Sequence, residues 1–291
     1  MTLKEVLKRA LAEGWSTGHF NASELDQMRA IIEACKEVGS PVIIGTSEGE
    51  RRHLGLAEAV VLRDSFRKEL KIPIFLNADH SKSVETAKEA VDAGYDSIHI
   101  DLSELPFEDN IKGTKEVVEY AKSKFSIFNF QFSIEGELGY LRGESKIQNE
   151  KITVDRKDYT QPEQAKEFVE KTNVDRLAIV VGNIHGISLD EPNLDIERIK
   201  EIRTVVSKDV ALILHAGSGI PADQIRAAIG AGIANIHINT DIRIAYAEGL
   251  REGLKKDPAG VAMYKLDKEA TERTKEVIRE KLELFGSVNR I

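Results

Sequence analysis

The stretch IPIFLNADHSKSVETAKEAVDAGYDSIHIDLS (residues 72–103) is the part of the sequence that decides the fold class. It begins with an apolar run, breaks at polar residues, follows a helical pattern to Gly94 and ends in a second apolar run. Apolar runs that do not alternate with polar residues indicate strands buried on both faces, as in parallel sheets covered by helices. The stretch therefore predicts a strand, a helix over 83–94 and a second strand parallel to the first.

The same unit recurs along the chain, with further helical patterns at 161–172 and 220–232. The eight predicted strands are WSTGHF (15–20), PVIIGTS (41–47), IPIFLNADH (72–80), SIHIDLS (97–103), FQFSIEGELG (130–139), RLAIVVGNIHG (176–186), ALILHAGSG (211–219) and ANIHINTD (234–241). Eight such units predict an α/β protein with a (β/α)8 TIM barrel, additional C-terminal helices and a single domain over residues 1–291. A doubly wound open sheet is the alternative, but no GxGxxG motif follows the first predicted strand.

The composition excludes several classes of function. Hydrophobic residues make up 41% of the chain and charged residues 31%, as in an ordinary globular protein. The formal net charge of −8 argues against nucleic acid and membrane surfaces as partners. No apolar run approaches the roughly 20 residues that a membrane span requires, and the N-terminus lacks the pattern of a signal peptide. A single cysteine, Cys35, cannot build a disulfide framework, so we expect a reducing, cytoplasmic location.

Polar residues gather where the predicted strands end, and the carboxyl ends of barrel strands meet at one face. Three of the seven histidines, His80, His185 and His215, occupy such positions. Each alone could be an ordinary hydrogen-bonding histidine of a loop. Together they predict a metal site, because imidazole is a common zinc ligand and three ligands leave one coordination position for substrate. Glu137 and Asp101 could supply a further ligand or orient a histidine.

The segment HAGSG (215–219) predicts an anion site. Its small residues expose backbone N–H groups, and it leads into a helix whose start is marked by Pro221. Barrels often bind phosphate in the loops after their seventh and eighth strands, and the eighth predicted strand leads into Asn239 and Thr240. We therefore expect a small phosphorylated substrate, captured by local donors because the net charge of the chain repels anions.

These segments resemble the class II, metal-dependent ketose-bisphosphate aldolases, the fructose- and tagatose-bisphosphate aldolase group. The matching segments run in the family's order from about residue 18 to residue 245: FNASELDQMRAIIEA, VIIGTSEG, ADHSKSVE, HIDLSELPFEDNI, EGELG, VGNIHG, LHAGSG and INTD. The most specific feature is the joint set of DH, GxxHG and HxGSG at the ends of the third, sixth and seventh predicted strands.

The resemblance implies a carbon–carbon lyase of carbohydrate metabolism that reversibly cleaves a phosphorylated ketose to dihydroxyacetone phosphate and an aldehyde, as in glycolysis. It implies that His80, His185 and His215 bind the catalytic zinc ion, and that Asp79 transfers the proton of the hydroxyl group at the bond that breaks. The chemistry fits these residue types: a Lewis-acid metal stabilises the charge left on the carbonyl group, and a carboxylate can transfer the proton.

The resemblance also assigns further residues. Glu137 and Asp101 match positions of a secondary metal site, for a second divalent or a monovalent cation. The residues matched to substrate binding are Asn21, Ser47, Gly186, Ala216, Gly217, Ser218, His237, Asn239 and Thr240. The family further implies a homodimer or homotetramer.

Two segments depart from the family pattern. The loop after ELG usually reads GGxE, with the glutamate acting as base on the dihydroxyacetone carbon, but here it reads YLRGES (140–145). Glu144 is then the candidate base, although Ser145 occupies the aligned position. A DPR-type segment that supplies an arginine for a far phosphate is replaced by LDKEATERTKEV (266–277), where Arg273 is an unaligned substitute. The substrate is therefore expected to be a phosphorylated ketose with or without a second phosphate.

Three strand residues also depart from the pattern: Asn77 replaces a histidine, His99 a methionine-like residue and His237 an asparagine. Side chains two apart on a strand share a face, so His99 lies beneath Asp101. We hypothesise a polar layer that joins His99 and His237 below the metal; the alternative is two independently satisfied core histidines.

Two other functions stay open on the sequence alone. The altered loop could redirect the reaction to that of a metal-dependent sugar-phosphate isomerase or epimerase. It could also mark a catalytically weakened sugar-phosphate-binding barrel, although retention of Asp79 and all three histidines argues against that loss.

Overall fold

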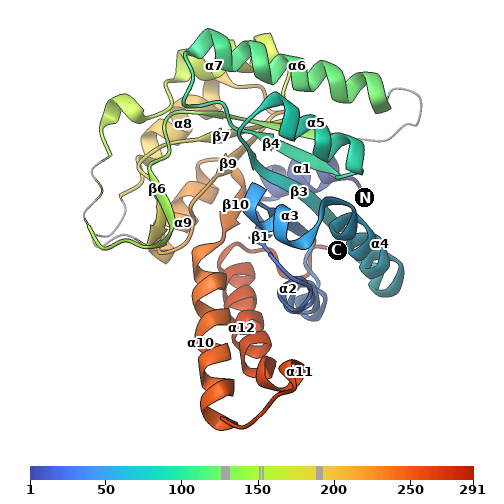
Figure 1. Cartoon of the computed structure of the whole chain (residues 1–291). Coiled ribbons are helices and arrows are strands. Elements are labelled where there is room, and N and C mark those ends of the chain that lie inside the picture. The colour runs from blue at the N-terminus through green and yellow to red at the C-terminus, as the bar shows by residue number, and fades with distance from the viewer. Residues whose placement is uncertain (126–131, 151, 153, 188–192) are drawn as a thin grey trace.

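The computed structural model describes residues 1–125, 132–150, 152, 154–187 and 193–291 (Figure 1). Within these residues, parallel strands close into a barrel in the order β1-β10-β9-β7-β5-β4-β3-β2. The barrel strands are β1 (Thr17–Asn21), β2 (Val42–Thr46), β3 (Ile74–Ser81), β4 (Ser97–Ile100), β5 (Ser133–Leu138), β7 (Arg176–Ile179), β9 (Ala211–Leu214) and β10 (Ile233–Ile238). The closed barrel confirms the predicted (β/α)8 fold.

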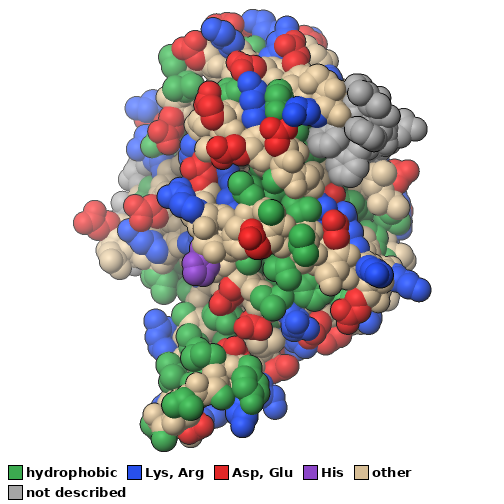
Figure 2. Space-filling model, turned by 45° about the vertical axis from the view of Figure 1, so that its right-hand side comes forward, with side chains coloured by type: hydrophobic (Ala, Val, Ile, Leu, Met, Phe, Trp, Pro, Cys, Tyr) green, Lys and Arg blue, Asp and Glu red, His purple; other side chains and the backbone are tan. Residues whose placement is uncertain are grey.

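Helices surround the barrel and extend beyond it. They are α1 (Leu3–Glu13), α2 (Leu25–Val38), α3 (Glu48–Leu54), α4 (Leu56–Leu70), α5 (Val84–Ala93), α6 (Phe107–Phe125), α7 (Pro162–Thr172), α8 (Ile196–Val205), α9 (Ala222–Gly230), α10 (Thr240–Lys256), α11 (Met263–Leu266) and α12 (Lys268–Leu284), with a short 3-10 helix at Arg156–Asp158. Figure 1 shows α10 and α12 side by side as a projection with α11 at its far end, and this projection forms the lower end of the molecule in Figure 2. The projection contains the predicted additional C-terminal helices. Among the described helices, none combines the length and apolar character needed to cross a membrane.

Helix α5 illustrates how local sequence sets the helix boundaries. The side chain of Ser83 accepts a hydrogen bond from the N–H of Thr86 and caps the first turn. Gly94 ends the helix in the left-handed conformation (φ 93°), which glycine adopts without steric cost. The predicted helix over 83–94 is therefore confirmed, and the predicted helices at 161–172 and 220–232 correspond to α7 and α9.

Several predicted strands are too long. The regular strands end at Ile100, Ile179 and Leu214, whereas the apolar runs suggested 103, 186 and 219. The residues just beyond these ends belong to loops, and these loops place polar side chains at the carboxyl end of the barrel. Part of the predicted sixth strand instead forms β8 (His185–Ile187), which pairs in parallel with the unpredicted β6 (Gly143–Ile147) outside the barrel. Residues 130 and 131 of the predicted fifth strand lie outside the described residues.

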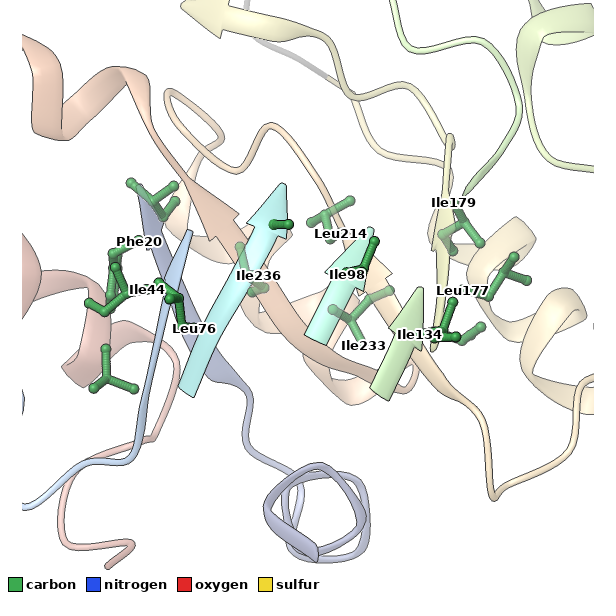
Figure 3. Packing of buried hydrophobic residues seen from close by; sticks show 14 of the residues in the cluster. Phe20, Ile44, Leu76, Ile98, Ile134, Leu177, Ile179, Leu214, Ile233 and Ile236 are labelled. Atoms are coloured by element: carbon green, nitrogen blue, oxygen red, sulfur yellow. The ribbon is translucent and has the colours of Figure 1, made fainter. Parts of the chain in front are cut away.

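Alternate residues of the barrel strands face outward and inward. Outward side chains such as Phe20, Ile98 and Ile236 form the main apolar core with the helices (Figure 3). At the amino ends of the strands, α1 packs against inward apolar residues that include Ile43 and Phe75. Towards the carboxyl ends the inward residues are polar. Strand register places His19 beside His237, Asn77 beside Ser97, and Glu135 between His99 and Arg176.

Candidate active site

A cavity of about 370 Å³ opens at the carboxyl ends of the barrel strands. It is lined by every residue that the sequence assigned to metal binding, proton transfer or substrate binding, except Gly217. These residues are Asn21 on β1, Ser47 after β2, Asp79 and His80 on β3, Asp101 after β4, Glu137 on β5, Glu144 on β6, His185 and Gly186 on β8, His215, Ala216 and Ser218 after β9, His237 on β10, and Asn239 and Thr240 after it. Residues far apart in the sequence thus meet at one site.

Gly217 differs from the other assigned residues in its backbone contacts. Its N–H group donates a hydrogen bond to the carbonyl oxygen of His237, 2.9 Å away, so that N–H is not available to an anion. The role of this glycine is close packing, because a side chain here would meet Ile236 and Ile238.

Two of the predicted metal ligands, His80 and His215, face each other. Nε2 of His80 and Nδ1 of His215 lie 3.2 Å apart. The other nitrogen of each ring contacts a carboxylate: His80 Nδ1 lies 2.8 Å from Asp101 Oδ2, and His215 Nε2 lies 2.6 Å from Glu135 Oε1. A carboxylate accepts hydrogen bonds, so these outer nitrogens carry the protons in the neutral rings. In the neutral rings, each of the two facing nitrogens then has a lone pair.

This pair of nitrogens fits a metal ion. In a tetrahedral zinc site with Zn–N bonds of about 2.0–2.1 Å, neighbouring nitrogens are separated by about 3.3 Å. The ring centre of His185 lies 5.0 Å from that of His80. Among the described residues, the potential ligand atoms of Asp79, His80, His99 and His215 lie within 4.8 Å of one another, a group that does not include His185. The donor set therefore suits a divalent cation between His80 and His215, with His185 next to it.

The electrostatics of His185 and His215 favour the metal-binding form of each ring. Burial and the neighbouring His80 lower the pKa of His185 to about 3. Burial and two neighbouring imidazoles hold the pKa of His215 well below its usual value. Both rings are therefore neutral near pH 7, and neutral imidazole is the form that binds metal. Burial acts to lower the pKa of His80, but the carboxylates of Asp79, Asp101 and Glu137 together raise it.

Asp101 and Glu137, the other predicted metal ligands, form a second group with His80 and His99. The potential ligand atoms of these four residues lie within 4.8 Å of one another. His99 Nε2 lies 2.9 Å from Glu137 Oε2, but both atoms are buried without a hydrogen bond. Lys82 brings Nζ to 2.6 Å from Asp101 Oδ2 and also lines the cavity. The group could hold a second cation or orient His80.

The carboxylate of Asp79 lies close to Asn21, His99 and His237. Its Oδ2 accepts a hydrogen bond from Asn21 Nδ2 at 2.9 Å. Its Oδ1 is buried without a hydrogen bond, 3.6 Å from His99 Nδ1 and 3.5 Å from His237 Nδ1. Burial acts to raise the pKa of Asp79, but the neighbouring imidazoles of His80, His237 and His99 together outweigh it, and the pKa is well below its usual value. The side chain is thus a carboxylate that can accept a proton.

The hypothesised polar layer of His99 and His237 forms around His215 and Asp79. The ring centre of His215 lies 4.5 Å from that of His99 and 3.8 Å from that of His237. His99 and His237 are therefore linked through His215 and Asp79, and neither is an independently satisfied core histidine. The layer is wider than the sequence suggested, because Glu135 joins His215 to the buried Arg176 on β7.

Sequence reasoning missed Glu50 and Arg243, which hold several cavity residues together. Glu50 is buried, and its Oε2 accepts hydrogen bonds from Asn21 Nδ2 and the N–H of Ser47, each at 2.8 Å. Its Oε1 accepts from Arg243 Nη2 at 2.6 Å, and Arg243 lines the cavity. In the sequence both residues resemble ordinary charged residues in the first turns of helices, so nothing in their local context identified them.

Glu144 and Arg273, which lie in the two segments that depart from the family pattern, each form an ion pair in the structure. The carboxylate of Glu144 is largely exposed and forms an ion pair with Lys146 at 2.8 Å, so it lines the cavity without contacting the histidines. Arg273 on α12 pairs with Glu252 at 2.6 Å and is not part of the described cavity lining. Arg273 therefore does not serve the site of its own chain in this conformation.

Comparison with known proteins agrees with this arrangement. The family model "Fructose-bisphosphate aldolase class-II" matches residues 1–290. The chain belongs to this family. It is similar to a fructose-bisphosphate aldolase of Staphylococcus aureus (strain Mu50), with 38% identity covering 100% of this chain and 98% of the relative. It is also 35% identical to a fructose-bisphosphate aldolase of Geobacillus stearothermophilus, with 99% and 97% coverage.

Solved structures show the same likeness. The YdjI aldolase from Escherichia coli K12 aligns with a TM-score of 0.81 and 32% identity, covering 98% of this chain and 97% of that one. A fructose-bisphosphate aldolase from Campylobacter jejuni shares the fold, with a TM-score of 0.78 and 22% identity. This class-II aldolase is thus a metal-dependent carbon–carbon lyase, and the isomerase, epimerase and binding-protein alternatives are not favoured.

Proposed function

We propose that this class-II aldolase reversibly cleaves a phosphorylated ketose to dihydroxyacetone phosphate and an aldehyde, with a zinc ion bound by His80, His185 and His215. The observation that supports this most directly is the 3.2 Å approach of two ring nitrogens, His80 Nε2 and His215 Nδ1, beside a buried carboxylate. Fructose bisphosphate is the first ketose to test, because the relatives from Staphylococcus and Geobacillus carry that name.

The bound cation supplies Lewis-acid chemistry by stabilising the negative charge that develops on the substrate carbonyl oxygen. Asp79 takes the proton from the hydroxyl group at the bond that breaks and returns it in the condensation direction. Asn21 orients Asp79 through its bond to Oδ2. Asp101 and Glu135 each hold one histidine so that its free nitrogen points into the site.

We further propose that the phosphate of the dihydroxyacetone end binds where the loop after β9 meets the start of α10. Ser218 and Thr240 line the cavity there, and Ser218 Oγ accepts a hydrogen bond from the N–H of Asp241 at 3.2 Å. A helix N-terminus favours an anion. Lys82 and Arg243 are the two basic side chains of the described cavity lining, and they are candidates for a second anionic group of the substrate.

We also propose roles for three further carboxylates that line the cavity. Glu144 is the candidate base for the dihydroxyacetone carbon, which requires its side chain to leave Lys146. Asp101 and Glu137 are candidates for a second divalent or a monovalent cation. We also expect one domain over residues 1–291, a homodimer or homotetramer, and a cytoplasmic location; these predictions rest on the sequence and the family.

One experiment tests the function. The purified protein is loaded with zinc, supplied with dihydroxyacetone phosphate and a panel of aldehydes, and followed for both condensation and tritium exchange at the dihydroxyacetone phosphate carbon. Exchange together with condensation is the expected result. Exchange without condensation for any aldehyde would support an isomerase-like reaction, and binding without exchange would support a binding protein.

A further inference from the structure

Two neighbouring residues of β3, Asp79 and His80, both line the cavity. In a regular strand they could not, because successive side chains point to opposite faces of the sheet. The alternation is regular just before them. Ala78 packs in the outer apolar core, whereas the side chain of Asn77 accepts a hydrogen bond from Arg176 across the barrel interior. Regular alternation would therefore turn His80 outward, on the same side as Ala78, and away from the site.

A β-bulge changes the direction of the His80 side chain. Between two successive register pairs, β3 contains two residues, Asp79 and His80, whereas β4 contains one, His99. Such a bulge bends the strand and turns a side chain in a new direction. His80 adopts the left-handed conformation (φ 43°), which is unfavourable for a residue with a Cβ atom. A conformation of this kind persists only where surrounding contacts hold it.

The guanidinium of Arg51 makes such contacts on both sides of His80. Arg51 lies on α3 and is buried. Its Nη1 donates hydrogen bonds to the carbonyl oxygens of Asp79, at 2.9 Å, and of Thr46, at 2.8 Å. Its Nη2 donates to Ser81 Oγ at 3.0 Å. One planar group therefore joins the residues before and after His80 to each other and to the end of β2.

These contacts indicate that Arg51 acts on the strand and not on the substrate. Among the residues that the structure describes, those that line the cavity do not include Arg51. Two of its three hydrogen-bond acceptors are backbone carbonyl oxygens, and the third is the hydroxyl of Ser81. The rigid fork of donors in a guanidinium suits this task, because it reaches several acceptors in a fixed geometry.

We propose that Arg51 is a positioning residue for the metal site: it holds the β3 bulge that turns His80 into the cavity beside Asp79. This inference rests on the proposed binding of zinc by His80. Without the guanidinium, β3 can relax towards regular alternation, and the imidazole of His80 then leaves its place 3.2 Å from His215. The expected consequence is weaker metal binding.

The zinc affinity of Arg51→Met, measured by competition with a chromophoric chelator, tests the proposal. Methionine keeps an unbranched apolar stem and removes the guanidinium. The affinity should fall about 10- to 100-fold, the usual effect of losing a group that orients a ligand. The d–d absorption spectrum of the cobalt(II)-loaded protein should also change, because it reports the number and arrangement of the ligands. An unchanged zinc affinity or an unchanged cobalt spectrum in a folded Arg51→Met protein would overturn the proposal.

Arg63→Met is the matched control. Arg63, on α4, is as buried as Arg51, and its Nη1 also donates to a backbone carbonyl oxygen, that of Gly94, at 2.8 Å. It pairs with Asp96, which precedes β4 and so lies at the amino end of the barrel, away from the cavity. Arg63→Met should lower the free energy of unfolding of the metal-free protein but leave the zinc affinity and the cobalt spectrum unchanged. An equal loss of zinc affinity in both variants would assign the effect to general destabilisation and contradict the positioning role.

Two milder variants decide the question if Arg51→Met does not fold. Ser81→Ala removes one of the three acceptors, and Arg51→Lys keeps the charge but loses the planar fork. Each should lower the zinc affinity by less than the removal of the whole guanidinium. Unchanged zinc affinity in both folded variants would refute the role of Arg51.

His80→Ala separates this inference from the proposed function on which it rests. It removes a proposed ligand and should abolish tight zinc binding. If His80→Ala kept the zinc affinity of the unsubstituted protein, the proposed ligand set would be wrong, and the role of Arg51 would fall with it. Loss of zinc binding in His80→Ala without any loss in Arg51→Met would refute the positioning role alone.

Discussion

Glu135 Oε1 lies 2.6 Å from His215 Nε2, while the second oxygen of the same carboxylate lies 2.7 Å from Arg176 Nη1. Glu135 and Arg176 are completely buried, and His215 is nearly so. Burial acts to raise the pKa of Glu135, but the guanidinium of Arg176 and the neighbouring imidazoles together outweigh it and keep this pKa well below its usual value. An ionised carboxylate thus fixes the ring of a proposed metal ligand, which directs His215 Nδ1 towards His80.

The first prediction concerns this contact. Glu135→Gln should weaken zinc binding by about 10- to 100-fold, the usual effect of losing a group that orients a ligand. The neutral amide replaces one of the two carboxylate oxygens by an NH₂ group, so either His215 or Arg176 then faces a donor. Zinc affinity is measured by competition with a chromophoric chelator. Glu37→Gln, an exposed change on α2, is the control; equal zinc affinity in the two variants would show that Glu135 does not orient His215.

Asp79 should act in only one of the two halves of the reaction. Asp79→Ala should lose condensation but retain tritium exchange at the dihydroxyacetone phosphate carbon, because the hydroxyl proton is transferred only when the aldehyde takes part. His215→Ala, which removes a proposed metal ligand, should lose both. Loss of exchange in Asp79→Ala with zinc still bound would assign the carboxylate a different role.

The ends of the strands were the part of the site that the sequence could predict. His80, Asp101 and His215 were identified because each follows an apolar run, and the barrel brings such ends together. The loop that contains Gly217 was also recognised, but its hydrogen bonding was not. The N–H of Gly217 is bonded to His237 O, a partner on a strand that only the closed barrel places beside it.

The buried layer below the site could not be predicted in the same way. Glu135 and Arg176 are single polar residues of strands. The local sequence around such a residue does not differ between a buried and an exposed position. Their partnership depends on the register of β5 and β7, which sets Glu135 opposite Arg176. The stack of His19 and His237 depends likewise on the register of β1 and β10. Register follows from packing of the whole barrel, so no local pattern encodes it.

The candidate loop base gives a separate prediction. Glu144→Gln should slow tritium exchange at the dihydroxyacetone phosphate carbon by at least about 100-fold, the usual contribution of a general base, with little change in zinc content. Lys146→Met removes the ion-pair partner that holds Glu144 in the structure and should not lower exchange. Normal exchange in Glu144→Gln would mean that another group removes the proton.

Acid should destabilise the metal-free protein through His185. The pKa of this ring is about 3 in the folded chain, because of burial and His80, against an ordinary value of 6.5. As the pH falls below 6.5, His185 binds a proton in the unfolded chain, whereas in the folded chain it does not bind one until the pH is near 3. Stability is therefore present above pH 6.5 and is lost as the pH falls from there towards 3. Urea unfolding of the chelator-treated protein at several pH values should show this slope, and His185→Gln should flatten it; equal slopes would mean that His185 is protonated in the folded chain.

Ala216, next to the proposed ligand His215, should be a strained residue. Its φ is 56°, in the left-handed region, where a Cβ atom costs about 1–2 kcal/mol. Ala216→Gly removes this cost but increases the entropy of the unfolded chain, so a net gain of up to about 1 kcal/mol in the free energy of unfolding is expected. Ala227, exposed within α9, is the matched control. Ala227→Gly should lose about 1 kcal/mol, because the helical backbone there favours alanine. Opposite signs for the same chemical change would locate the strain at position 216. Destabilisation by both glycines would mean that Ala216 is not strained in solution, and that the backbone beside His215 is held without cost.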